Sequence, residues 1–454
     1  MPEILNAATD KFTAMTTQPV KPLLVRLAIP AIAIMMVSAM YNLADTFFVG
    51  FLGTSATAAV GVCFSLMTII QAIGFFFGHG TGNYISRALG AQRSEDAEKV
   101  ASTGFFTCLG VSGLLAGAGL FFMDPLAKLL GSTETILPYA RSYLRFILIG
   151  MPFMVGALML NNLLRFQGNA FWGMIGMTSG AALNIGLDPL FIFGFHLNVT
   201  GAALATMISQ TLSCLLLFFI CRTKKTRTVR IAFSNFAASR RRYKEIARGG
   251  LPSLLRQGLM SLSTLILNHA AGPYGDAVIA AVSIVNRVFL IAASAILGLG
   301  QGFQPVCGFN YGARLYRRVK EAFFFCLRIS TFLLVLAAAL LFALAPGIIA
   351  LFRPDDPVVI RTGTFALRLY CCVLPLMGWT VLNQMMLQTM GKALAASILA
   401  AAKQGLFLIP LLLILPPLFE VRGILFCSPL AEACTFLFSL PLGIGVLTRD
   451  LKTN

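Results

Sequence analysis

Two carboxylates lie inside long apolar segments in the first half of the sequence. Asp45 lies in the segment that begins near Leu24, and Asp188 lies in the stretch LNIGLDPLFIFG, residues 183–194. If these segments cross a membrane, each ionisable side chain costs roughly 2.5 to 3.5 kcal/mol on insertion scales, which makes it a candidate functional group. A carboxylate at that depth could bind and release a small cation, either H+ or Na+.

Two neutral, oxygen-bearing side chains are expected at the same depth. Asn184 precedes Asp188 by four residues, so the two share one helix face. At 1.5 Å per residue, Asp45 and Asp188 lie roughly 7 to 8 Å from the outer ends of their segments, and Thr206 lies roughly 9 Å inside the next one. We predict that Asp45, Asn184, Asp188 and Thr206 form a cation-coupling site. The alternative is a structural role, in which the acids stabilise turns and the neutral side chains only bond neighbouring helices.

Pro189 follows Asp188 directly. Proline lacks a backbone N–H, and its ring crowds the carbonyl group four residues earlier. We therefore predict a helix bend at Pro189, which would couple occupancy of the cation site to the shape of the helix.

A second ionisable pair lies in the last two apolar segments. Lys403 and Glu432 both fall near the middle of their segments. An ion pair between them would offset the cost of burying each charge. They form a candidate secondary ionisable site, either as a structural ion pair or with Glu432 as a second proton carrier. The three histidines have no metal-ligand spacing, and we predict no metal site.

The elements that carry these residues are apolar segments long enough to cross a bilayer. Apolar residues make up 57% of the 454 residues, and the mean hydropathy is +0.83. A helix of about 20 apolar residues spans the roughly 30 Å hydrocarbon core. We predict an all-α integral membrane protein with twelve transmembrane helices. The expected spans are residues 24–50, 56–80, 98–122, 136–164, 170–193, 200–222, 246–271, 276–303, 320–346, 360–388, 394–417 and 421–448.

The basic residues indicate which side of the membrane each loop faces. The net charge is +18, from 35 Lys and Arg residues against 17 Asp and Glu residues. Most of these basic residues lie in the tails and in the loops on one side, whereas the opposite loops hold only Lys128, Arg141, Arg353, Arg361 and Arg422. By the positive-inside rule, we predict a multi-pass protein of the plasma membrane, the inner membrane of a bacterium, with both termini in the cytoplasm. This explanation leaves no need for nucleic-acid binding.

The second half of the sequence repeats the first at an offset of 222 residues. Pro30 matches Pro252 and Gly78 matches Gly300, and further Gly, Ala and Asn residues keep the same register. Six spans per half give both halves the same orientation, with a pseudo-symmetry axis along the membrane normal. We predict two pseudo-symmetric six-helix bundles: a first lobe over residues 1–222 with the cation-coupling site, a basic cytoplasmic linker over 223–245, and a second lobe over 246–454.

The acids of the first half are absent from the second. At the same offset, the counterparts of Asp45, Asn184, Asp188 and Thr206 are Leu267, Leu406, Pro410 and Ser428. A carboxylate needed only for the fold would be useful in both copies. The loss of both acids therefore favours a coupling site confined to the first lobe.

Four stretches of the sequence resemble the multidrug and toxic compound extrusion (MATE) family of cation-coupled exporters. They are YNLADTFFVGFLG (41–53), GHGTGNYISRALGAQ (78–92), LNIGLDPLFIFG (183–194) and GLGQGFQPVCGFNYGA (298–313). The resemblance covers nearly the whole chain and implies a V-shaped pair of six-helix bundles. It also implies a secondary active antiporter that exports amphipathic or lipophilic organic cations, such as drugs and toxic compounds, in exchange for H+ or Na+ by alternating access. In the family, positions that match Asp45, Asn184, Asp188 and Thr206 are associated with cation binding.

An antiporter of this kind would interact with small organic cations, the lipid bilayer and its coupling ion, H+ or Na+. We expect no cofactor beyond that ion, and no obligate protein partner is evident, so we predict a monomer. No HExxH or GxSxG motif is present, and we predict no enzyme activity.

Two other functions fit the sequence less well. A flippase for lipid-linked oligosaccharide precursors shares the broad architecture, and it is favoured by the arginines inside the spans. However, such flippases commonly add spans and line their cavity with positive charge, whereas this chain pairs its clearest acids in one lobe. The arginines inside the spans are Arg145, Arg256, Arg287, Arg328 and Arg368.

An ion channel is a further alternative. It fits a six-plus-six duplication less well than a transporter with alternating access does.

Overall fold

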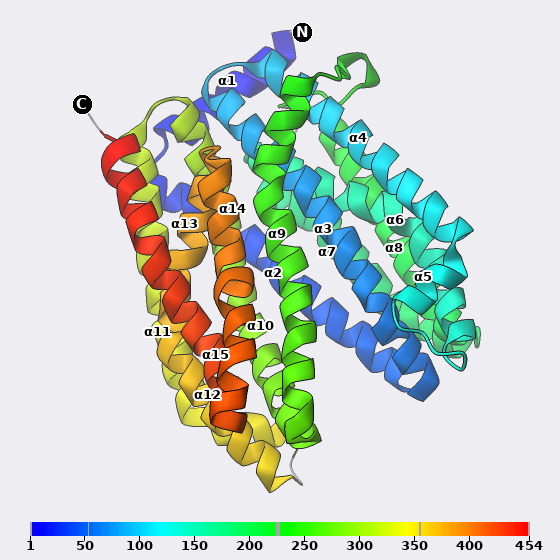
Figure 1. Cartoon of the computed structure of the whole chain (residues 1–454). Helices are drawn as coiled ribbons and strands as arrows, with labels where there is room; N and C mark the ends of the chain where they lie inside the picture. Colours follow the sequence, from blue (N-terminus) through cyan, green and yellow to red (C-terminus); the bar gives the residue numbers. More distant parts are fainter. Residues whose placement is uncertain (1, 53, 224–227, 354–355, 453–454) are drawn as a thin grey trace.

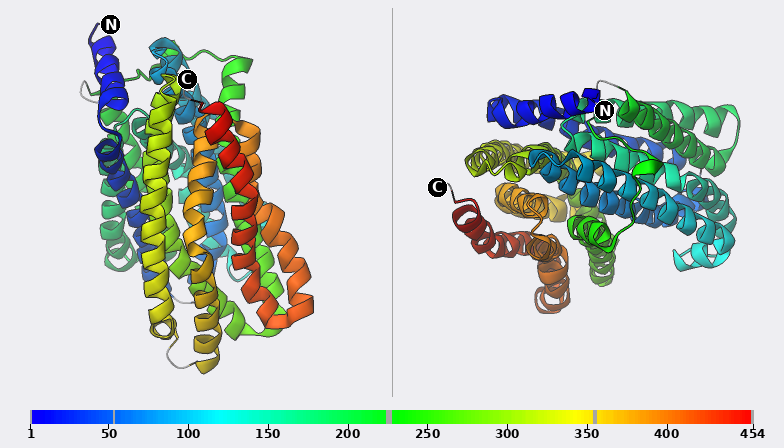
Figure 2. Two further views of the ribbon diagram at one scale, coloured as in Figure 1. Left: turned by 90° about the vertical axis from the view of Figure 1, so that its left-hand side faces the viewer. Right: turned by 90° about the horizontal axis from the view of Figure 1, so that it is seen from above.

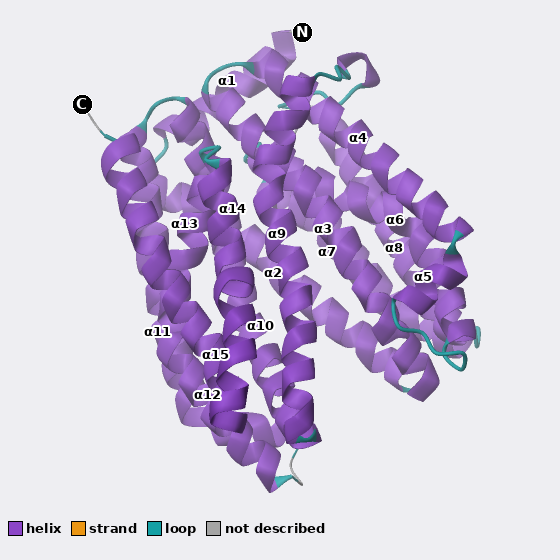
Figure 3. Ribbon diagram, in the orientation of Figure 1, coloured by secondary structure: helices purple, strands orange, loops and turns teal. Residues whose placement is uncertain are grey.

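The computed structural model describes residues 2–52, 54–223, 228–353 and 356–452. The regular structure in these residues is helical throughout, as Figure 3 shows, which confirms the predicted all-α class. Helices satisfy their own backbone hydrogen bonds, as a chain in lipid must. The main helices of the two bundles are α2 (Val20–Gly50), α3 (Thr54–Gly90), α4 (Ser94–Phe121), α6 (Leu137–Phe166), α7 (Ala170–Pro189), α8 (Asn198–Arg222), α9 (Arg240–Ala271), α10 (Asp276–Gly312), α11 (Tyr316–Phe352), α12 (Pro357–Val373), α13 (Met377–Thr389) and α15 (Ile409–Gly445). The remaining elements are α1 (Pro2–Thr17), α5 (Met123–Leu129), α14 (Ala393–Ala401), the π-helices η1 (Leu190–Gly194), η5 (Ala402–Leu408) and η6 (Val446–Asp450), and the 3-10 turns η2 (Phe233–Asn235), η3 (Gly272–Tyr274) and η4 (Leu374–Leu376).

Ten segments of the described residues are long and apolar enough to cross a membrane. Two features relate them to the twelve predicted spans. The last segment, Ala393–Asp450, is 58 residues long and contains two predicted spans, because α15 consists of two helices that meet at Glu420. The predicted span in α9 is not among the ten, since polar residues such as Arg256 and Asn268 lower its hydropathy.

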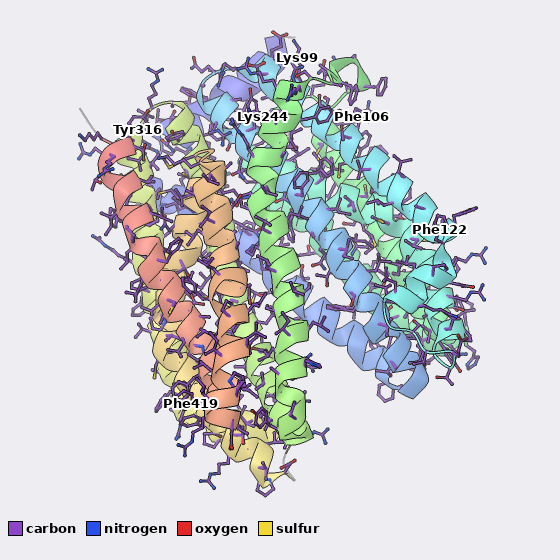
Figure 4. All side chains as sticks on the ribbon, viewed as in Figure 1. Lys99, Phe106, Phe122, Lys244, Tyr316 and Phe419 are labelled. Atoms are coloured by element: carbon purple, nitrogen blue, oxygen red, sulfur yellow. The ribbon has the colours of Figure 1, made fainter. Side chains whose placement is uncertain are left out.

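The helices form two bundles that diverge from one end of the molecule (Figure 1). The first lobe holds α2, α3, α4, α6, α7 and α8, and the second holds α9 to α15. Both termini lie at the end where the lobes meet, as the side view in Figure 2 also shows. This arrangement is the predicted V shape. Lys99 and Lys244 lie at the same end as the termini, whereas Phe419 lies at the opposite end (Figure 4).

Unusual backbone conformations recur at the offset of the sequence repeat. Left-handed φ angles occur at Gln92 (57°) and Arg314 (60°), and again at Asn198 (53°) and Glu420 (51°). Both pairs are 222 residues apart, since 314 − 92 = 222 and 420 − 198 = 222. Residues with a side chain rarely adopt this region. The matching turns therefore support duplication of the backbone as well as of the sequence.

The lobes meet through helices that approach too closely for side chains. A Cβ on Gly80 of α3 would lie 2.2 Å from the carbonyl oxygen of Ile246 in α9. A Cβ on Gly302 of α10 would lie 2.5 Å from the Cα of Ala28 in α2. Only glycine permits such contacts, because it has no Cβ. Both contacts are in the halves of these helices nearer the termini, so this end joins the lobes.

The short helix α1 contacts both lobes at this end. The Nζ of Lys11 donates a hydrogen bond to the carbonyl oxygen of Gly168, between α6 and α7, at 3.3 Å. The Nδ2 of Asn310 in α10 donates to the carbonyl oxygen of Met15 at 3.1 Å. α1 is therefore bound to each lobe by a hydrogen bond. The sequence pattern did not predict this helix, because its residues do not form an apolar span.

Candidate functional site

Helices α7 and α8 of the first lobe are closely packed because small residues face each other. The hydroxyl of Ser213 donates to the carbonyl oxygen of Gly176 at 2.8 Å. A Cβ on Gly180 would lie 2.8 Å from the Cβ of Ser213. Polar groups at such an interface have to bond to one another, since neither lipid nor bulk water reaches them.

Three of the four predicted coupling residues meet between these helices. Asp188 and Thr206 are 0% exposed, and Asn184 is 1% exposed. In one amide orientation, Asn184 Nδ2 lies 3.3 Å from Thr206 Oγ1. With the amide turned, its nitrogen donates to Asp188 Oδ2 at 3.0 Å, and its oxygen accepts from the backbone N–H and the hydroxyl of Thr206 at 3.2 and 3.3 Å. The turned orientation pairs both the nitrogen and the oxygen, so it suits a charged carboxylate.

Asp45 is the fourth predicted coupling residue, and its side chain lies outside the described residues. Its helix, α2, packs against α7. The ring of Phe51, which follows α2, lies edge-on to the ring of Phe193 in η1, with 6.1 Å between centroids. Asp45 precedes Phe51 by six residues and Asp188 precedes Phe193 by five, so the backbones of the two acids are at similar heights. Participation of the Asp45 carboxylate stays a prediction.

The backbone changes its helix type beside Asp188. The α-helical pattern of α7 ends at Pro189, and the π-helix η1 begins at Leu190. A π turn contains one more residue than an α turn and is frequent at functional sites. The predicted bend at Pro189 stays a prediction, but the structure places an irregular turn at the residue expected to carry it.

Lys403 and Glu432 form an ion pair in the second lobe. The Nζ of Lys403 lies 2.6 Å from Oε2 of Glu432, whose side chain is 1% exposed. Tyr370, Thr380 and Phe289 surround the pair from three further helices. Sequence analysis did not identify these three residues, because aromatic and hydroxyl side chains are common in membrane helices and carry no local signal of a long-range contact.

A buried arginine connects the two lobes. Arg165 of α6 is 1% exposed, and its Nη1 donates to the carbonyl oxygen of Gln301 at 2.7 Å and to Oε1 of Gln304 at 3.0 Å, both in α10. Its Nη2 donates to Oδ1 of Asn162 at 2.6 Å. Sequence analysis did not single out Arg165, which lies at the end of its predicted span. The structure places its charge between the lobes rather than in a loop.

Neutral hydrogen bonds join the lobes beside Arg165. Nδ1 of His79 in α3 lies 2.7 Å from the hydroxyl of Ser253 in α9. Within the second lobe, the same hydroxyl accepts from Nε2 of Gln388 in α13 at 2.9 Å, which holds Ser253 in place. The hydroxyl of Thr389 donates to Oδ1 of Asn83 at 2.9 Å. Each bond is buried, and together they form a polar seal between the lobes.

The sequence profile of the family described as MatE matches residues 30–190 and 252–414. The two matched segments begin 222 residues apart, since 252 − 30 = 222, which is the offset of the repeat. The chain is 31% identical over 404 residues to the multidrug export protein MepA of Staphylococcus haemolyticus, covering 88% of each chain. It is 30% identical over 436 residues to MepA of Staphylococcus aureus, covering 96% of this chain and 95% of that protein.

Solved structures of transporters share this fold. A MOP superfamily transporter from Pyrococcus furiosus, described as having a binding pocket of reverse polarity that suggests a different function, matches with a TM-score of 0.91 at 28% identity. That match covers 97% of this chain and 99% of the other. An outward-facing multidrug resistance MATE transporter matches with a TM-score of 0.89 at 28% identity, over 97% of this chain and 100% of the other.

Proposed function

This chain belongs to the MatE family, and we propose that it is a secondary antiporter that exports amphipathic or lipophilic organic cations in exchange for H+ or Na+. It is a multi-pass membrane protein with the fold of multidrug efflux transporters. The observation that carries the antiport proposal is the buried cluster of Asn184, Asp188 and Thr206 in one lobe. A carboxylate, an amide oxygen and a hydroxyl are the oxygen donors that a hard cation prefers.

The Asn184 amide links the carboxylate to the neighbouring helix. Its nitrogen donates to Asp188 Oδ2 at 3.0 Å, and its oxygen accepts from the backbone N–H and the hydroxyl of Thr206 at 3.2 and 3.3 Å. A sodium ion or a proton that binds Asp188 would share the carboxylate with this N–H donor. Loading would therefore act on the amide and, through Thr206, on α8.

The contacts between the lobes support alternating access. The lobes are joined at the end with the termini by the glycine contacts, by Arg165 and by the polar seal of His79, Ser253 and Gln388. They diverge at the other end (Figure 1). With the termini in the cytoplasm, this is an outward-facing state. Return to the inward-facing state requires these contacts to break while contacts form at the opposite end.

The proposed substrates are flat, lipophilic cations, and the chain has side chains that suit them. It contains 38 Phe and 18 Met residues, which hold such molecules by dispersion, sulfur–aromatic and cation–π contacts. In this proposal the transporter acts as a monomer in the bilayer of the inner membrane and uses no cofactor other than the coupling ion.

Efflux of ethidium tests the proposal. Cells that produce the protein should extrude ethidium faster than cells with an empty vector. Purified protein in proteoliposomes should transport ethidium when a pH gradient or a Na+ gradient is imposed, and comparison of the two gradients identifies the ion. Transport driven by neither gradient would contradict secondary antiport.

One observation favours a second candidate, the flippase for lipid-linked oligosaccharide precursors. The Nε of Arg256 in α9 is buried and has no hydrogen-bond partner among the described residues. An arginine in this state can bind an anionic phosphate. The same proteoliposomes distinguish the candidates, because a flippase should move a fluorescent lipid-linked oligosaccharide across the bilayer and should not respond to ethidium.

A further inference from the structure

Glu432 lies at the centre of a polar cluster within the second lobe. Its Oε2 lies 2.6 Å from Nζ of Lys403, which belongs to the π-helix η5. Its Oε1 accepts a hydrogen bond from the hydroxyl of Thr380 in α13 at 3.2 Å. The Glu432 side chain is 1% exposed, whereas the Lys403 side chain is 22% exposed. The carboxylate is thus fully buried, whereas the lysine side chain that pairs with it is partly exposed.

The surroundings of the Lys403 ammonium are those of an ammonium-binding site. Its Nζ donates to the hydroxyl of Tyr370 at 3.2 Å and lies 4.7 Å from the centre of the Phe289 ring. It also lies 5.8 Å from the centre of the Tyr370 ring. Aromatic faces within about 6 Å stabilise a cation, and a buried carboxylate supplies the opposite charge. These groups come from α10, α12, α13 and α15, so each lies on a helix other than η5, which carries Lys403.

A small apolar pocket adjoins the cage. Phe289 and Tyr370 form part of its wall, together with Leu341 and Leu367. The aromatic walls are therefore not fully packed on that side.

Lys403 and Glu432 lie on the pair of helices that corresponds, in the repeat, to the pair carrying the candidate site of the first lobe. The counterparts of Asn184 and Thr206 are Leu406 and Ser428 at the 222-residue offset. Lys403 precedes Leu406 by three residues, and Glu432 follows Ser428 by four, so the pair lies about 5 Å deeper, one helical turn. The first-lobe counterparts of Lys403 and Glu432 are Ala181 and Gln210, so this ion pair exists in one lobe only.

We propose that Glu432, Tyr370, Thr380 and Phe289 form a monovalent-cation site whose resident cation is the side-chain ammonium of Lys403. The second lobe then carries its cation covalently and takes none from solution. The first lobe, under the proposed antiport function, exchanges its cation with solution. Lys403 thereby confines ion coupling to the first lobe, and this consequence rests on the proposed antiport function. The cation site itself does not depend on that function.

Removal of the tethered ammonium should leave a site that accepts a free one. Lys403→Ala deletes a group equivalent to n-propylammonium, so that ion is the probe. In purified detergent-solubilised protein, n-propylammonium chloride should raise the unfolding temperature of Lys403→Ala by on the order of 2 °C at saturation. The wild type and the double variant Lys403→Ala/Glu432→Gln should show no such shift. The double variant also controls for ionic strength, because it is measured at the same concentration of the salt.

A second variant protects the test against poor folding of the first. Lys403→Met keeps the length of the chain as far as Cε, with sulfur in place of Cδ, and removes the ammonium, so its probe is the ammonium ion. Ammonium chloride should stabilise Lys403→Met and not Lys403→Met/Glu432→Gln. Equal shifts for the variants with and without Glu432, or no shift in either single variant, would overturn the proposal. Because the readout is binding to purified protein, a failure of drug efflux would leave this result unaffected.

Discussion

The two lobes bury an acid within corresponding pairs of helices, but on different members of the pair and in different surroundings. In the first lobe, Asp188 lies beside the Asn184 amide, which bonds to Thr206. In the second lobe, Glu432 lies 2.6 Å from the Lys403 ammonium. Carboxylate, amide and hydroxyl oxygens suit an exchangeable hard cation, whereas an ammonium on a side chain cannot leave. The duplicated lobes thus share one backbone scaffold but differ in their side chains. The first-lobe centre suits an exchangeable cation, whereas the second-lobe centre holds a permanent ion pair.

Neutralising the first-lobe acid should have the largest effect. Asp188→Asn keeps the shape of the side chain and removes the charge that would hold the coupling cation, so ethidium efflux should fall to the level of cells without the transporter. The measurement is efflux at matched protein levels. Asp124→Asn is the matched control, because Asp124 pairs with Arg141 at 2.6 Å in an exposed position outside the spans. Wild-type efflux by Asp188→Asn would remove the coupling role of this centre.

Breaking the second-lobe pair should instead destabilise the protein. Glu432→Gln leaves the Lys403 ammonium without its counter-charge and should cost about 3 to 5 kcal/mol of unfolding free energy, whereas replacing both partners with neutral groups should restore most of it. Thermal unfolding of Glu432→Gln and of Lys403→Met/Glu432→Gln checks this. The exposed pair Lys128–Glu134 provides the control, since Glu134→Gln should change stability little. A double variant as unstable as Glu432→Gln alone would show that the charges do not compensate each other.

Alternating access requires the lobes to separate at the end with the termini. Gly80→Ala places a Cβ 2.2 Å from the carbonyl oxygen of Ile246 and should disfavour the closed contact by about 1 to 3 kcal/mol. Distances between spin labels on the two lobes should therefore lengthen at the end with the termini. Gly110→Ala is the control, because nothing lies within 4 Å of its added Cβ. Unchanged distances in Gly80→Ala would indicate a contact that does not open.

The smallest effect is expected from the hydroxyl of the first-lobe centre. Thr206→Val removes the group that bonds the Asn184 amide and should weaken cation binding by about 1 kcal/mol, roughly five-fold. The coupling-ion concentration for half-maximal transport measures this loss. Ser428→Ala, at the corresponding position of the second lobe, should leave that concentration unchanged. Equal shifts in both variants would mean that the lobes are not specialised as proposed.

The sequence predicted the class and arrangement of the helices but not all of their ends. The predicted span 56–80 stops ten residues before the end of α3 at Gly90, and the span 276–303 stops nine before the end of α10 at Gly312. Hydropathy marks residues that can face lipid. The missed ends contain polar residues such as Asn83 and Asn310, which are buried and hydrogen-bonded at the end where the lobes meet. The helices α3 and α10 continue there because their own backbone hydrogen bonds and the contacts between the lobes stabilise them.

The candidate site was predictable where its residues are close in sequence. Asn184 and Asp188 share a face at four-residue spacing, and that relation holds for any helix. Thr206 was placed by counting residues from the predicted ends of adjacent spans. The partners of Lys403 other than Glu432 could not be found in this way, because Tyr370 and Phe289 belong to helices whose rotation about their axes is not encoded in hydropathy.

By itself the sequence determined the membrane class, the duplication, the asymmetry of basic loops and the absence of counterparts of Asp45 and Asp188 from the second half. These follow from length, composition and spacing, which act along one chain. Only the tertiary structure decided that Arg165 lies between the lobes and that an aromatic cage surrounds Lys403. The physical reason is that lipid and a neighbouring helix are equally apolar, so hydropathy does not distinguish the face of a helix that packs against other helices from the face that contacts lipid. Packing of small residues and buried hydrogen bonds makes that choice.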